Sequence, residues 1–166
     1  MAWRRWAEVR KILEQDLLFD SLKGRVRYFA TRYRKAHDEA GRVAILVDEK
    51  EVINMSLLIE DARYGEVHKR EADEPDKTFL EIHEKVYNEF AEKGLYHPGD
   101  FVFSLDKFLS LNIQEALKSD DYLVRMFAIM DRRVGKRTLE KIKLTISDVP
   151  EWLQFFYILR LENEGV

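Results

Sequence analysis

Five charged residues near the middle of the sequence form the densest cluster that could bind a ligand. They are Asp131, Arg132, Arg133, Lys136 and Arg137. Four cations beside one carboxylate could hold a phosphate or carboxylate group, because guanidinium groups bind such anions through paired hydrogen bonds. The same charges also suit a helix that ends at Gly135, with cations in its last turn and an ion pair to Asp131. We favour the helix-end interpretation and keep the anion-binding site as the alternative.

A second group of basic and aromatic residues lies within residues 25–42, where the sequence alternates like a β-strand. The candidate nucleic-acid-binding residues in this group are Arg27, Tyr33, Arg34 and Lys35. RNA-binding sheets stack bases on aromatic rings and neutralise phosphates with basic side chains. One face of such a strand must however belong to the core, and basic residues on the other face are commonly only solvated. We therefore keep nucleic-acid binding as an alternative here too.

No motif in the sequence predicts catalysis or a cofactor. There is no cysteine, and the four histidines do not lie at the spacing of metal ligands. The run from Gly135 to Thr138 lacks the upstream glycine and the adjacent Lys and Thr of a phosphate-binding loop. We predict no catalytic residue, no metal and no cofactor, although carboxylates distant in the sequence could still meet as an acid–base pair.

The central cluster must be positioned by the helix that precedes it. Apolar residues recur there at helical spacing, at Leu123, Phe127, Met130 and Val134. Ser119, Asp120 and Asp121 can cap the start of this helix, and Gly135 is expected to end it in a left-handed conformation. Phe127 lies in the middle of the apolar face, so we expect it at the centre of the core.

The remaining elements predict an α+β fold. Three short strands with short connections indicate a three-stranded antiparallel β-meander over residues 25–55, with Val26 and Tyr28 sharing one face. A first helix is expected over residues 2–18, and residues 56–166 are expected to be mostly helical, giving about six α-helices around the meander. Thr78 and Asn112 have the spacing of helix caps, and Asp100 is expected to cap a helix over residues 101–109. We predict a single α+β domain over residues 1–166.

Composition narrows the class of protein further. The formal net charge of the 166 residues is −3, with an acidic middle between two more basic ends. No apolar run has the length needed to cross a bilayer, and the N-terminus lacks the uninterrupted apolar core of a signal peptide. Because the chain has no cysteine, a reducing cytoplasm is the simplest location, although the absence of cysteine is also compatible with secretion.

Several stretches carry a resemblance to a known family. These are residues 25–42 (RVRYFATRYRKAHDEAGR), 53–56 (INMS), 131–139 (DRRVGKRTL) and 155–165 (FFYILRLENEG). They resemble a family of small bacterial proteins of unknown function. The resemblance implies a bacterial, cytoplasmic origin and one compact domain. It supplies no catalytic or binding residues.

Three hypotheses about function remain open. The leading one is a non-enzymatic cytoplasmic module that binds an unknown protein partner, because two basic and aromatic-rich surfaces occur without any catalytic constellation. The second is a nucleic-acid-binding protein that uses the basic hairpin and residues 132–137. The third is a small enzyme that acts on an anionic substrate. A continuous basic stripe joining Arg27, Arg34 and Arg133 would favour the second, and a closed pocket holding Asp131 and His97 would favour the third.

Overall fold

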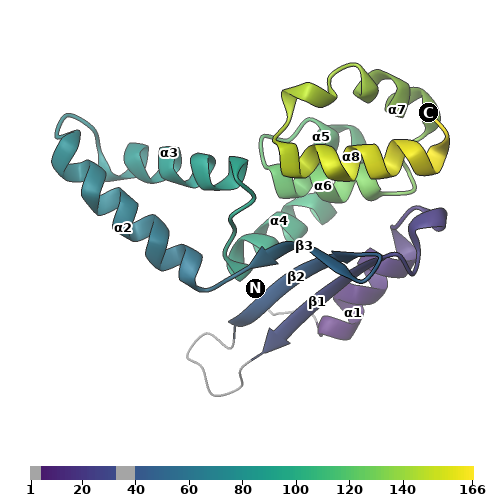
Figure 1. The fold of residues 1–166 in the computed structure, drawn as a ribbon, viewed down its shortest axis with the longest axis horizontal. Coiled ribbons are helices and arrows are strands. Elements are labelled where there is room, and N and C mark those ends of the chain that lie inside the picture. Colours follow the sequence, from purple (N-terminus) through teal and green to yellow (C-terminus); the bar gives the residue numbers. More distant parts are fainter. Residues whose placement is uncertain (1–4, 33–39) are drawn as a thin grey trace.

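The computed structural model describes residues 5–32 and 40–166. Within them the chain folds as an antiparallel sheet of three strands and eight α-helices (Figure 1). The strands are β1 (Val26–Arg32), β2 (Ala40–Val47) and β3 (Lys50–Met55). The helices are α1 (Trp6–Lys11), α2 (Leu58–Asp73), α3 (Phe79–Glu92), α4 (Pro98–Ser110), α5 (Ile113–Leu117), α6 (Tyr122–Met130), α7 (Lys136–Lys143) and α8 (Glu151–Glu164). The predicted fold class, a small meander followed by a mostly helical chain, is confirmed.

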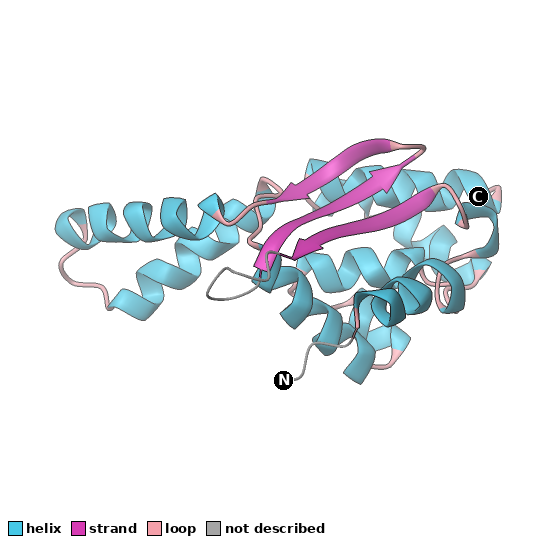
Figure 2. Ribbon diagram, turned by 90° about the horizontal axis from the view of Figure 1, so that it is seen from below, coloured by secondary structure: helices cyan, strands magenta, loops and turns pink. Residues whose placement is uncertain are grey.

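The sheet has the order β1-β2-β3, and both pairs of strands are antiparallel. Alternate residues face the core, so Val26 and Tyr28 of β1 pair with Val47 and Ile45 of β2, and these side chains are buried. Figure 2 shows the three strands lying across the helices of the body. The alternation read from the sequence therefore identified the buried face correctly.

The core lies between the sheet and helices α4, α6 and α8. Phe127 is buried at its centre, with ring centroids 5.4 Å from Phe101, 5.6 Å from Phe108 and 6.3 Å from Tyr28. Aromatic pairs at these separations add to the stabilisation that burial gives. The predicted central position of Phe127 is confirmed.

Helices α2 and α3 form an antiparallel hairpin that extends away from the rest of the molecule (Figure 1). The hairpin has a small apolar cluster of its own, made by Val67, Ile82 and Val86 with Phe90 packed against it. Arg70 ties the two helices together, because it donates to Glu66 on its own helix and to Glu89 on α3. This projecting hairpin forms one wall of the cleft described below.

Helix α6 ends earlier than the sequence predicted. It stops at Met130, because Asp131 takes an extended conformation and pairs with Leu18. The Phe19 amide donates to the Met130 carbonyl, and the Arg132 amide donates to the Leu17 carbonyl. Gly135 has a φ of −84° and is the N-cap residue before α7, so its expected role as a left-handed helix stop was wrong. The helix therefore ends because the chain around Met130 forms hydrogen bonds with Leu17 and Phe19, more than a hundred residues earlier in the chain.

Two other helix starts also differ from expectation. The first helix begins at Trp6 and continues into a wider turn over Ile12–Asp16. Helix α4 begins at Pro98 and not at residue 101, because His97 accepts from the Gly99 amide and Asp100 accepts from the His97 amide. No helix in the described ranges is long and apolar enough to span a membrane.

Candidate functional site

Asp131 and Arg133 of the predicted cluster form a hydrogen-bonded ion pair. The Asp131 carboxylate is fully buried and accepts from the Arg133 backbone amide at 2.8 Å and from Arg133 Nη2 at 2.7 Å. Arg133 Nε donates to the same carboxylate at 3.0 Å, and the pair raises the pKa of the Arg133 guanidinium. Because this carboxylate already binds a cation through several hydrogen bonds, it fixes the loop after α6.

Arg160 supports the same loop from α8 and was not identified from the sequence. Its side chain is buried, Nη2 donates to the Val134 carbonyl at 2.9 Å, and its guanidinium lies 3.5 Å from the ring centroid of Phe19. Nη1 also donates to Glu164 at 2.5 Å. The sequence hinted at its burial only by placing a basic residue among the apolar residues of α8, and basic residues in helices are usually solvated.

The other members of the predicted cluster are not held in this way. Arg132, Lys136 and Arg137 are exposed and make no ion pair with any residue in the described ranges. The structure therefore divides the predicted cluster into a hydrogen-bonded pair, the buried Asp131 with the exposed Arg133, and three exposed cations with no ion pair in the described ranges.

The basic residues of the sheet are largely paired with acids. Arg25 makes two hydrogen bonds to Asp48, at 2.8 and 2.7 Å, and Arg27 donates to Glu49 at 3.0 Å. Arg42 pairs with Glu51 and lies over the half-exposed ring of Phe29. Tyr33, Arg34 and Lys35, the other candidate nucleic-acid-binding residues, lie outside the described residues. A nucleic acid on this face would have to displace carboxylates from the arginines that the structure does describe.

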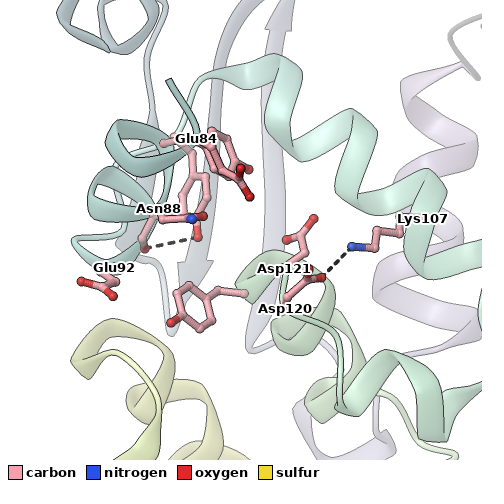
Figure 3. A pocket seen from close by; sticks show the side chains of 10 residues that line it. Glu84, Asn88, Glu92, Lys107, Asp120 and Asp121 are labelled. Carbon is pink, nitrogen blue, oxygen red and sulfur yellow. Dashed lines mark hydrogen bonds and ion pairs between the residues drawn. The ribbon is translucent and has the colours of Figure 1, made fainter. Parts of the chain in front are cut away.

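A cleft of about 470 Å³ lies where the α2–α3 hairpin meets the body. Figure 3 shows Glu84, Asn88 and Glu92 of α3 on one wall and Lys107, Asp120 and Asp121 on the other. The aromatic lining consists of Tyr87, Tyr96 and Tyr122. Four carboxylates and three tyrosines thus meet in one concave surface, and they come from α3, the α3–α4 loop, the α5–α6 connection and the start of α6.

Some charged side chains of the cleft have hydrogen-bond partners within the chain, and others have none among the described residues. Lys107 Nζ donates to Asp120 at 3.1 Å, and this contact lowers the pKa of the Asp120 carboxyl. Asp121 caps α6 by accepting from the Leu123 and Val124 amides, and it accepts from Ser104. By contrast, Glu84 and Glu92 are exposed and make no ion pair with any described residue.

The tyrosines contribute apolar area and hydroxyl groups to the same cleft. Burial raises the pKa of Tyr87, with a further contribution from nearby Asp100, and burial also raises the pKa of Tyr96. Both tyrosines are therefore neutral over the physiological range. The rings and carboxylates together suit a cationic group, because a cation is attracted both to an aromatic face and to a carboxylate.

Asp131 and His97 were expected to share a closed pocket if the chain were a small enzyme. His97 caps α4, and its Nε2 lies 3.6 Å from Glu60, whereas the cavity beside Asp131 is lined by Leu13, Tyr28, Phe127 and neighbouring residues. Asp131 and His97 therefore do not share that cavity. Among residues 5–32 and 40–166, no group of three or more His, Cys, Asp or Glu side chains could hold a metal ion.

The fold places the protein in the α+β class, and comparison with known proteins identifies its family. Residues 5–161 match the SF0329 protein family, a family of uncharacterised proteins. The match covers nearly the whole chain, so the protein belongs to this family. Neither the curated proteins nor the solved structures gave a significant match. Family membership confirms the resemblance noted in the sequence and leaves function to be argued from the site.

Proposed function

We propose that the chain is a non-enzymatic protein-interaction module whose cleft receives a lysine or arginine side chain from a basic segment of its partner. The observation that carries the proposal is the composition of the two walls. Four carboxylates and three tyrosines line the cleft, and Lys107, the one cation among its lining residues, is already paired with Asp120. A guest cation would gain the unpaired Glu84 and Glu92 together with the partly exposed rings of Tyr87 and Tyr122.

The structure of the hairpin base supports this assignment. The guanidinium of Arg63 lies 4.7 Å from the ring centroid of Tyr87, so one arginine of this chain already stacks on a ring of the cleft. Asp100 accepts from Arg63 at 2.7 Å and compensates its charge. The positive charge of Arg63 therefore opposes the entry of a second cation less than an unpaired arginine would. A cytoplasmic location, as the family resemblance implies, is part of the proposal.

A labelled peptide of alternating arginine and glycine, titrated with the full chain in a fluorescence-anisotropy assay, tests the proposal. We expect saturable binding that weakens with salt, and no binding of the matched peptide of alternating glutamate and glycine. Exposed charge pairs contribute about 0.2–1 kcal/mol each, so the double variant Glu84→Gln with Glu92→Gln should weaken binding about two- to thirtyfold.

The matched control neutralises two exposed carboxylates outside the cleft, through Asp76→Asn and Glu162→Gln. Both double variants change the net charge equally, so only the cleft variant should lose affinity. Equal losses would mean that the peptide responds to net charge and not to the cleft. Absence of peptide binding at low salt would reject a cation-binding cleft altogether.

A further inference from the structure

Helix α6 ends at Met130 and not at Gly135, so the favourable charge of a helix C-terminus no longer explains two of the exposed cations. Lys136 and Arg137 were expected near the C-terminal end of a helix, where positive charge is favourable. They occupy the first turn of α7 instead, and that turn has no acidic residue. Gly135 precedes them and provides no side-chain cap. Two cations at the positive end of a helix are electrostatically unfavourable, so helix stability does not account for them.

We define the basic surface as the exposed cations of α7 and of the loop before it, which are Arg132, Lys136, Arg137, Lys141 and Lys143. All five are exposed, and none forms an ion pair with a residue of the described ranges. The loop that carries Arg132 is held by the hydrogen bonds from Arg133 to the buried Asp131 carboxylate and by the hydrogen bond from Arg160 to Val134. The basic surface is therefore presented by a fixed part of the fold.

We propose that the basic surface binds the phosphate backbone of a nucleic acid, without reading its sequence. The eight residues of α7 extend over about 12 Å, which is long enough to meet several consecutive phosphates of one strand. Phosphate contacts of this kind give affinity but no base specificity.

A membrane surface fits α7 less well. The apolar side of the helix is used by the fold, because Leu139 is buried and Ile142 packs against the core. Only Leu144 is left as an exposed apolar residue at its end. An interfacial helix needs a free apolar face, and α7 has none to offer. This site is distinct from the proposed cleft, since the two share no residue and their ligands have opposite charge.

The test measures the affinity of the full chain for short labelled RNA and DNA duplexes while the salt concentration is varied. We expect measurable binding at about 50 mM salt that falls steeply towards about 200 mM, with a slope of about −0.9 for each phosphate neutralised. The double variant Lys136→Glu with Arg137→Glu should lose at least about tenfold in affinity and reduce the slope by about two. The same variant should melt at an equal or higher temperature, because acidic residues suit the start of a helix.

Two further variants separate the basic surface from general electrostatics. Lys50→Glu with Lys69→Glu changes the net charge equally at the start of β3 and on α2, and should retain most of the affinity. Glu140→Gln removes the one acidic residue of α7 and should strengthen binding.

Three results would overturn the proposal. The first is the absence of binding at low salt, and the second is an equal loss in the two double variants. The third is binding to anionic lipid vesicles with none to either duplex. The cleft peptide assay is independent of all three, so failure at one site would leave the other standing.

Discussion

Truncation of Phe127 should cost more stability than any exposed substitution, because its ring fills the middle of the core. Large-to-small changes of a buried phenylalanine cost about 3–5 kcal/mol. Phe127 is 3% exposed and contacts three aromatic rings, and a cavity of about 10 Å³ already lies beside it. Each aromatic pair adds about 0.5–1.5 kcal/mol beyond burial, so we expect Phe127→Ala near the upper end, at about 4–5 kcal/mol.

Thermal unfolding followed by circular dichroism measures this loss. For a chain of this size, about 1 kcal/mol lowers the melting temperature by about 2–4 °C, so Phe127→Ala should lower it by about 8–20 °C. The whole domain is stabilised by only about 5–15 kcal/mol, so the variant would lose a large share of its stability. Urea denaturation provides an independent value, and its slope should not change.

Phe103→Ala is the matched control, because Phe103 lies on α4 with 74% of its side chain exposed. It should change stability by no more than about 0.5 kcal/mol. If Phe127→Ala lowered the melting temperature by only a degree or two, or if the two alanine variants behaved alike, the packing described here for α4, α6 and the sheet would be refuted.

Two further predictions concern the α2–α3 hairpin and its base. Gly65 lies inside α2 with open space around it, so Gly65→Ala should stabilise the protein by about 0.5–1 kcal/mol. Gly94 has a φ of +72° and approaches Trp152, so Gly94→Ala should destabilise; equal melting temperatures for the two variants would contradict this assignment. The hydrogen bonds from Arg70 lower the pKa of Glu89, so this contact stabilises the hairpin fully above the ordinary glutamate pKa of about 4.3 and is lost as the pH falls through the lower folded value. Amide exchange should then rise in the hairpin below that pH, and Glu89→Gln should remove the dependence.

The sequence by itself determined the features that depend on neighbours in the chain. The alternation over Val26 and Tyr28 predicted the buried face of the sheet, because side chains of a strand point to opposite sides in turn. Thr78 and Asn112 were identified as helix caps because a cap bonds to amides two or three residues away, and both are confirmed. The prediction of one domain over the whole chain stays a prediction.

The tertiary structure alone decided where α6 ends and which charges are buried. Arg160 carries no local signal of burial, since it contacts the Phe19 ring and the Val134 carbonyl from other parts of the chain. Asp131 pairs with nearby Arg133, but its burial depends on the distant bridge to Leu18. The cleft likewise joins α3, the α3–α4 loop, α4 and the start of α6, which form one concave surface only when they pack together. Helix capping and strand alternation are set by local backbone hydrogen bonding and side-chain direction, whereas a buried charge or a cleft exists only once distant segments pack together.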